Sequence, residues 1–328
     1  MRPNKSRQGR GLALAACTAA LSLLFTGCLG ASAAGDPHKV ALVVKSTETQ
    51  FFLSMFAGAE AAAAEYNIDL TITAPESEED YAAQNALVEQ AVEEGAEVIL
   101  FSATDYENTA EAINAAAQKG VGIIAIDSDV NSAAVATYIG TDNHAAGKMA
   151  AQAALERVEG ELNVGIINYG LNSANGQERE KGARETLEES GRAQVVQVIN
   201  TRAEAASAQT DTVALLQEHP EINVLLAFNE PTSVGAAEAV QQLGMSDAVF
   251  LVGFDSNVET VDDLQTGEVD ALVVQNPYAM GYLGVESAYK LLTGRSRELQ
   301  PTVDTSTRIV DRDNLFAMDS QKALFSFD

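Results

Sequence analysis

From residue 39 onward, short apolar runs alternate with longer stretches that have helical spacing. The runs, such as VALVV at 40–44, lack the apolar–polar alternation of half-exposed strands. Unbroken apolar runs separated by helices are typical of parallel strands that are covered on both faces. Gly follows several helical stretches, in EEG, QKG, ESG and QLG, where it fits the left-handed residue that closes a helix. The pattern predicts a doubly wound α/β fold.

The number of expected strands favours two sheets over one. The apolar runs expected to be strands are 40–44, 68–73, 98–101, 121–126, 135–139, 164–168, 195–199, 223–228, 249–254 and 269–274. The stretches expected to be helices include 80–94, 107–119, 145–158, 203–218 and 278–293. Ten strands are many for one open sheet. We therefore expect two similar parallel sheets, with a seam near residue 140.

Polar residues stand directly after most of the expected strands. Ligands of open parallel sheets bind beyond the carboxyl ends of the strands, so these positions are candidates for a cleft. They are Lys45, Ser102, Asp127, Asn168, Asn229, Asp255 and Gln275. A protein that only packs a core does not require polar residues there.

The net charge of −27 comes from 47 acidic and 20 basic residues. Nucleic-acid binding needs a basic surface that displaces counterions, so this composition argues against it. The charge suits a soluble extracellular protein, but it does not identify a substrate.

The N-terminus has the layout of an export signal. Residues 1–10 carry four bases and no acid, and residues 11–25 are apolar but short for a membrane span, which takes about 20 residues. With TGC at 26–28 the segment resembles a bacterial lipoprotein signal, although Phe25 stands where such signals favour Leu. That resemblance implies a lipid on Cys28. The alternatives are LAAC at 14–17, and ordinary cleavage after Ala33.

Both cysteines of the chain lie in this segment, at 17 and 28. The folded body is therefore expected to have no disulfide, no thiolate nucleophile and no cysteine metal site. The three histidines are scattered, and we expect no metal and no cofactor.

A series of short motifs resembles a known family over residues 39–310. The motifs are FF at 51–52, ATD at 103–105, IDSD at 126–129, IGTDN at 139–143 with Gly147, AFNE at 227–230, VGFD at 252–255 and VQNP at 274–277. In this order and spacing they resemble the type I periplasmic solute-binding proteins, specifically the ribose-binding-like sugar receptors of ABC transporters.

The resemblance implies two α/β domains joined by a hinge of three chain crossings, with ligand bound between them. After the signal segment 1–28 and a linker 29–37, it implies a first domain of 38–141 plus 276–301. The second domain would be 142–275 plus 302–328.

The resemblance also assigns site residues. Phe51 and Phe52 would pack on a sugar ring, and further ligand contacts would come from Asp127, Asn229, Asp255 and Gln275. Thr49 and Ser102 stand where the ribose receptor has asparagines. Ser128 and Gln177 stand where it has two cleft arginines, and Arg179 matches a different, structural arginine. Lys45 and Glu230 are charged residues at cleft-facing strand ends that could substitute for the missing arginines.

Several of these residues have a purely structural alternative. Phe52 lies on one helical stripe with Phe56 and Ala59 and could be core. Asp127 and Asp255 could form caps or turns, Asn229 could start a helix, and Gln275 could serve only as a hinge residue. Asp142 is expected to be the N-cap of the helix that follows it.

The expected function is that of a monomeric, lipid-anchored solute receptor in the cell envelope. It would deliver a small sugar-like ligand to the membrane permease of an ABC importer, without catalysis and without nucleic acid. One alternative is a receptor for a furanosyl signal molecule, nucleoside or polyol that feeds a sensor or chemoreceptor. Others are a secreted glycosidase using Asp127 and Asp255, and a transcription regulator, which the export signal and acidity disfavour.

Overall fold

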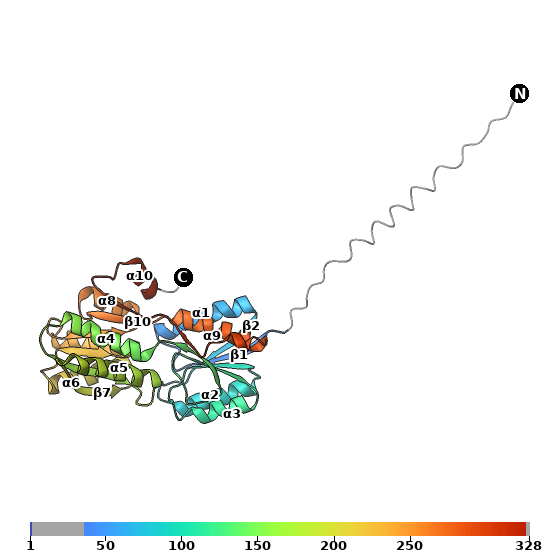
Figure 1. Ribbon diagram of the computed structural model, residues 1–328, viewed down its shortest axis with the longest axis horizontal. Helices are drawn as coiled ribbons and strands as arrows, with labels where there is room; N and C mark the ends of the chain where they lie inside the picture. Colours follow the sequence, from blue (N-terminus) through green and yellow to red (C-terminus); the bar gives the residue numbers. More distant parts are fainter. Residues whose placement is uncertain (2–35, 326–328) are drawn as a thin grey trace. The chain divides into compact units, whose positions relative to one another are not determined.

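The computed structural model describes residue 1 and residues 36–325. All of its helices and strands lie between His38 and Leu324, and the chain from His38 onward forms one compact unit (Figure 1). Cys28 and nearly all of the predicted signal segment and linker lie outside the described residues.

The strands form two six-stranded sheets, and all neighbours except β10 and β12 are parallel. The first sheet has the order β11-β5-β4-β3-β1-β2. Its strands are β1 (His38–Val43), β2 (Ile68–Thr73), β3 (Val98–Phe101), β4 (Gly122–Ile126), β5 (Val135–Gly140) and β11 (Thr302–Asp304). The second sheet has the order β12-β10-β9-β8-β6-β7. Its strands are β6 (Leu162–Tyr169), β7 (Ala193–Thr201), β8 (Val224–Ala227), β9 (Phe250–Phe254), β10 (Ala271–Val274) and β12 (Arg308–Asp311).

Helices cover both faces of each sheet. On the first sheet, α1 (Gln50–Tyr66) and α9 (Pro277–Leu292) share one core, while α2 (Tyr81–Glu93) and α3 (Ala110–Gln118) share another. On the second sheet, one core contains α4 (Asn143–Arg157) and α5 (Ala174–Ser190). The opposite core contains α6 (Ala205–Glu218), α7 (Glu230–Leu243), α8 (Val258–Thr266) and the terminal α10 (Met318–Leu324). A single 3-10 turn, η1 (Ser296–Glu298), follows α9.

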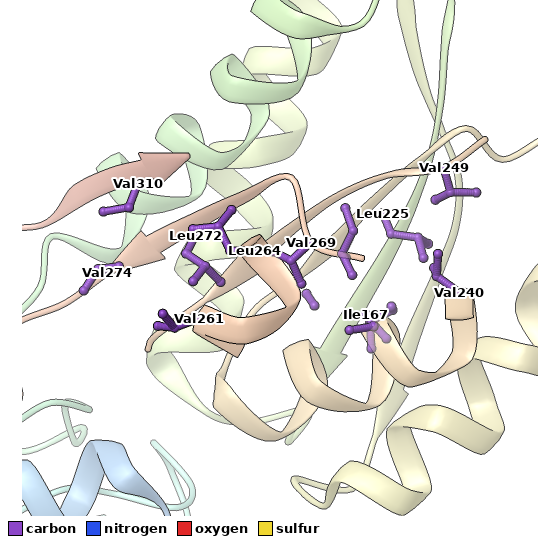
Figure 2. Packing of buried hydrophobic residues seen from close by; sticks show 14 of the residues in the cluster. Ile167, Leu225, Val240, Val249, Val261, Leu264, Val269, Leu272, Val274 and Val310 are labelled. Carbon is purple, nitrogen blue, oxygen red and sulfur yellow. The ribbon is translucent and has the colours of Figure 1, made fainter. Parts of the chain in front are cut away.

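The core under α7 and α8 shows why the sequences of the central strands are continuous apolar runs. Figure 2 shows Val261 and Leu264 of α8 beside Leu272 of β10, and Val240 of α7 near Ile167 of β6. Because the second face of the same sheet is buried under α4 and α5, successive residues of β8, β9 and β10 are apolar or glycine. The predicted α/β fold with two doubly wound sheets is confirmed, and each predicted strand overlaps an observed one.

One predicted domain boundary is wrong. Residues 302–304 were expected in the second domain, but they form β11, which pairs with β5 of the first sheet. The segment is a short edge strand with little buried apolar surface, so it carries no apolar run that could reveal it. Strand β12 was not predicted either.

Within the described residues the chain passes between the two sheets three times. The passages follow β5, follow β10, and lie between β11 and β12. They are hydrogen-bonded to one another: Thr141 Oγ1 donates to Gln275 Oε1 at 2.8 Å, and the Thr305 amide donates to the Gly140 carbonyl at 2.9 Å. The three passages therefore lie side by side, as a shared hinge requires.

Each half of the fold has a close helix crossing that depends on glycine. A Cβ on Gly147 of α4 would lie 2.0 Å from the carbonyl oxygen of Arg179 in α5. A Cβ on Gly281 of α9 would lie 1.9 Å from the carbonyl oxygen of Met55 in α1. These contacts fix the helices whose N-termini face the carboxyl ends of the strands.

Candidate functional site

A small cavity lies where the carboxyl ends of strands from both sheets meet. Its volume is about 30 Å³, and it adjoins an outer cleft of about 870 Å³. The lining residues from the first half of the fold are Lys45, Thr49, Phe51, Phe52, Glu78 and Asp127. Those from the second half are Tyr169, Asn175, Arg179, Asn229, Glu230, Pro231, Asp255 and Gln275.

Two aspartates occupy matching positions at the ends of β4 and β9. Asp127 and Asp255 both adopt left-handed backbone conformations, with φ of 61° and 69°. Their amides donate to the carbonyls of Ile139 and Val273 on the neighbouring strands, each at 2.9 Å. A left-handed conformation costs a residue other than glycine about 1–3 kcal/mol and is concentrated at functional sites. Here it accompanies carboxylates that line the cavity.

The Asp127 carboxylate is held from both halves of the fold. Its Oδ2 accepts a hydrogen bond from Ser102 Oγ at 2.7 Å, and its Oδ1 accepts one from Asn175 Nδ2 at 3.2 Å. Lys45 Nζ lies 4.0 Å from Oδ2. Ser102 does not line the cavity itself, and it acts on the site by orienting Asp127.

Lys45, which follows β1, reaches across to the N-terminus of α5. Its ammonium group donates to Ser173 Oγ at 2.9 Å and Asn175 Oδ1 at 3.2 Å, and it lies 5.7 Å from the centre of the Tyr169 ring. The side chain is 3% exposed. Burial lowers the pKa of Lys45, and the nearby Asp127 carboxylate opposes that shift.

Arg179 of α5 joins the cavity to the core of the second half. Its guanidinium donates to Asn143 Oδ1 at 2.9 Å, to the Phe228 carbonyl, and to Gln275 Oε1 at 2.9 Å. It also lies 4.5 Å from the centre of the Phe254 ring. The sequence assigned Arg179 a structural role alone. Because it also lines the cavity, the site has a buried guanidinium that the sequence interpretation did not expect.

Asp255 has a single hydrogen-bond donor although it is buried. Its Oδ1 accepts from Gln275 Nε2 at 2.6 Å, and no described residue donates to Oδ2. The side chain is 5% exposed. Burial raises the pKa of Asp255 to about 7, although Arg179 and Gln275 act in the opposite direction.

Glu230 connects the two halves at the edge of the cavity. Its carboxylate accepts from the backbone amides of Gln50 at 3.1 Å and Phe51 at 2.8 Å, which are the first residues of α1. Asn257 Nδ2 also donates to it, at 3.1 Å. A carboxylate at a helix N-terminus satisfies free amides and is favoured by the helix dipole. Glu230 begins α7, so one half of the fold caps a helix of the other.

The two phenylalanines contribute to both the core and the cavity wall. Phe51 and Phe52 meet edge to face, with ring centres 5.2 Å apart, and both line the cavity while packing in the core beneath α1. Phe52 also stacks on Phe56, at 6.4 Å. Phe56 is half-buried, packs against the same core and does not line the cavity.

Two predicted site residues lie elsewhere. Ser128 is fully buried, does not line the cavity, and its Oγ has no hydrogen-bond partner among the described residues. Gln177 is exposed and donates to the Leu171 carbonyl at 2.7 Å. The structure therefore gives neither residue the place of a cavity arginine.

Eight of the predicted residues do line the cavity: Lys45, Thr49, Phe51, Phe52, Asp127, Asn229, Asp255 and Gln275. Some also have the local role proposed as an alternative. Asn229 caps α7, accepting from the Thr232 amide at 3.0 Å, and Thr49 is the N-cap of α1. Capping and lining the cavity are compatible, because both place a polar side chain where a strand ends and a helix begins.

The sequence did not predict four of the lining residues: Glu78, Tyr169, Asn175 and Pro231. Two more lining residues, Arg179 and Glu230, were named in the sequence analysis but not as predicted ligand contacts. Tyr169 is the last residue of β6, where the sequence pointed to its neighbour Asn168, and Asn175 lies in the first turn of α5. Pro231 follows Glu230 in the AFNE motif. Glu78 lies in the acidic run PESEED, whose composition is typical of a solvated loop. No pattern in the sequence distinguishes Glu78 from its acidic neighbours.

The described residues contain no cluster of three or more His, Cys, Asp or Glu side chains arranged to hold a metal. Among the helices of that part of the chain, none has the length and apolar character needed to cross a bilayer.

The raised pKa of Asp255 predicts a pH-dependent stability for the ligand-free protein. Between its ordinary value of 3.8 and about 7 the folded state holds a proton that the unfolded state has released. The contribution of Asp255 to the free energy of unfolding therefore decreases as pH rises from about 4 to about 7, and is constant above that range. Urea denaturation of the wild type and of Asp255→Asn at about pH 5 and about pH 8 measures it. We expect the wild type to lose stability relative to the variant at the higher pH; a constant difference would contradict the pKa shift.

Comparison with known proteins identifies the family. The family model described as periplasmic binding protein domain matches residues 40–296. The D-ribose/D-allose-binding protein of Pseudomonas aeruginosa is 27% identical, over 92% of this chain and 97% of that protein. The ribose import binding protein of Escherichia coli K12 is 28% identical, over 81% of this chain and 88% of that protein.

Solved structures give the same result. A carbohydrate transporter solute binding protein from Agrobacterium radiobacter, in complex with D-arabinose, has a TM-score of 0.84 and 27% identity. The match covers 88% of this chain and 99% of that one. A sugar transporter from Clostridium phytofermentans has a TM-score of 0.77 and 32% identity, over 84% of this chain and all of that one. The resemblance found in the sequence is confirmed: the chain belongs to the periplasmic binding protein domain family of solute-binding receptors.

Proposed function

We propose that the protein is the solute receptor of an ABC importer and binds a small sugar or sugar-like ligand in the cavity between its two sheets. The observation that carries the proposal is the pairing in one cavity of an aromatic wall, Phe51 and Phe52, with acidic and amide groups from both halves. The polar groups are Asp127, Asn229, Asp255 and Gln275. The sugar ligands named for relatives of similar length support the same class of ligand.

The chemistry of a sugar ring matches this wall. One face of the ring presents C–H groups, which an aromatic face covers, while the rim presents hydroxyls. Carboxylates accept from hydroxyls, and amides both donate and accept. Asp255 Oδ2 is available for such a bond, because no described residue donates to it.

Ligand entry requires the two halves to separate. A cavity needs about 10–15 Å³ to hold one water, so 30 Å³ has room for about two waters rather than a sugar. The contacts of Lys45 with Ser173 and of Glu230 with α1 join the halves across the cavity. We propose that they break and re-form as the domains open and close about the three chain passages, and that the permease recognises the closed form.

The same proposal places the protein in the cell envelope as a monomer, anchored by a lipid on Cys28. A Cys28→Ala variant expressed in a bacterial host would be released from the membrane fraction into the soluble fraction. If the variant and the wild type partition equally, the lipid anchor is excluded.

The aromatic wall is tested by comparing two substitutions on α1. Phe52→Ala removes a ring that lines the cavity, whereas Phe56→Ala removes a half-buried ring that does not. We expect Phe52→Ala to weaken ligand binding about tenfold or more, the size of one lost aromatic contact, and Phe56→Ala to have the smaller effect on affinity. Calorimetric titration, with the free energy of unfolding measured alongside, decides the order. The reverse order would contradict the proposed cavity wall.

The proposed function is tested by thermal denaturation of the protein without residues 1–28 in the presence of pentoses, hexoses, polyols, nucleosides and furanosyl signal molecules. A ligand that binds only the folded state raises the melting temperature with its occupancy. We expect a shift with a sugar or a sugar-like compound. A shift with nucleosides alone would replace the sugar by a different ligand class, and no shift with any compound would contradict the proposal.

A further inference from the structure

Carboxylates outnumber cations around the cavity. Six ionisable side chains of these two kinds line it: the cations Lys45 and Arg179, and the carboxylates Glu78, Asp127, Glu230 and Asp255. A neutral sugar brings no charge to such a site. An unpaired charge in a buried site costs free energy. The numbers of cations and carboxylates that line the cavity therefore indicate which charge a bound ligand should carry.

Both cations already have partners inside the protein. Arg179 donates to Asn143, to the Phe228 carbonyl and to Gln275. Lys45 donates to Ser173 and Asn175, and the carboxylate beside it is that of Asp127, at 4.0 Å.

Two of the four carboxylates also have partners inside the protein. Asp127 has Ser102, Asn175 and Lys45, and Glu230 has the N-terminus of α1 and Asn257. Each of these groups has at least two donors. Neither carboxylate therefore requires a cation from a ligand.

Glu78 and Asp255 remain without sufficient partners. Asp255 Oδ2 accepts from no described residue although the side chain is 5% exposed. No hydrogen bond or ion pair joins the Glu78 carboxylate to any other described residue, and the Lys45 ammonium is directed to Ser173 and Asn175 instead. Glu78 is half-buried, and desolvation raises its pKa to about 7, with Lys45 opposing the shift. Among the described residues, the two cations that line the cavity are therefore both engaged elsewhere and do not pair with either carboxylate.

The route into the cavity is acidic as well. Lys45, Thr49, Glu78, Glu230 and Pro231 line both the cavity and the outer cleft. The outer cleft adds one arginine, Arg202, and five glutamates: Glu48, Glu76, Glu79, Glu204 and Glu259. A cleft lined by one sign of charge raises the local concentration of solutes of the opposite sign. Glu78 stands at the passage from cleft to cavity.

We propose, building on the proposed function, that the ligand is a cationic sugar-like compound, an amino sugar or aminocyclitol, and that Glu78 accepts its ammonium group. The three N–H donors of an ammonium group supply the charge and the hydrogen bonds that Glu78 lacks, and the hydroxyls of the same ring satisfy Asp255. Glu78 is then the residue that distinguishes an amine from a hydroxyl at one ring position.

Calorimetric titration of the protein without residues 1–28 tests the proposal, since that segment lies outside the compact unit. The ligands are amino sugars with the amine at different ring positions, an aminocyclitol, and the hydroxyl counterpart of each. We expect one amine to bind at least about tenfold more tightly than its hydroxyl counterpart, because its ammonium group forms a charge-assisted hydrogen bond with Glu78. Glu78→Gln should abolish that preference, so that the amine and its hydroxyl counterpart bind the variant with similar affinity. The matched control is Glu79→Gln, which alters an exposed neighbour in the outer cleft and should keep the preference.

Three outcomes would overturn the proposal, and they are distinguishable. If neutral sugars bind as tightly as every amine, the ligand is not cationic, while the proposed sugar receptor stands. If an amine is preferred but Glu78→Gln keeps the preference, Glu78 is not the recognising group. If neither charged nor neutral sugars bind, the proposed function fails together with this inference.

Discussion

Replacing Arg179 by alanine is expected to lower the free energy of unfolding by about 3–5 kcal/mol, the cost of removing one partner from a buried charged network. The guanidinium is 1% exposed and donates to Asn143, Phe228 and Gln275. Its loss removes this donor from Asn143 Oδ1 and the Phe228 carbonyl, leaves Gln275 Oε1 with the hydrogen bond from Thr141 alone, and removes the contact with the Phe254 ring. Since Gln275 in turn holds Asp255, we expect ligand affinity to fall as well. Guanidinium denaturation measures the loss of stability.

Arg184→Ala is the matched control on the same helix. Arg184 is 40% exposed and pairs with Glu180 at 2.8 Å, an arrangement that contributes only about 0.3–0.5 kcal/mol. We expect that variant to unfold close to the wild-type midpoint. Equal midpoints for the wild type and Arg179→Ala would show that the buried network does not support the second half of the fold.

Replacing Asp255 by alanine is expected to reduce ligand affinity by about two orders of magnitude or more while the protein stays folded. A hydrogen bond to a charged group contributes about 1.5–3 kcal/mol, and this carboxylate can accept from two hydroxyls. The fold should tolerate the change, because Asp255 contributes one side-chain hydrogen bond, from Gln275, and its raised pKa indicates a destabilised carboxylate. Calorimetric titration and circular dichroism measure affinity and folding together.

Asp142→Ala provides the contrast for that result. Asp142 caps α4 by accepting from the Ala145 amide at 2.9 Å, and it does not line the cavity. Losing the cap should lower the free energy of unfolding by about 1 kcal/mol and leave affinity unchanged. If Asp255→Ala binds ligand as well as Asp142→Ala does, Asp255 is not a ligand contact.

The sequence predicted the sheets and strand ends because these leave a local signal. Parallel strands buried on both faces must be continuously apolar, so the polar residue after each run stands out. Asp127, Asn229, Asp255 and Gln275 were found in this way and by family resemblance, and all four line the cavity.

The rest of the site could not be predicted because it depends on tertiary contacts. Arg179 reaches the cavity only because α5 packs closely on α4 at Gly147, a contact that no pattern around residue 179 reveals. Glu78 lies in a loop whose composition is that of any exposed acidic turn. Matching Ser128 and Gln177 to family positions did not predict their location correctly. The Ser128 side chain is buried away from the cavity, and the Gln177 side chain is exposed.

The strongest test of a ligand site between the two sheets is a crystal structure of the protein bound to the sugar or amino sugar that raises its melting temperature most. We expect density for the ring beside Phe52, with a hydroxyl within hydrogen-bond distance of Asp255 and the ligand enclosed by both halves of the fold. Ligand density outside this cavity, or in contact with only one half, would contradict the account.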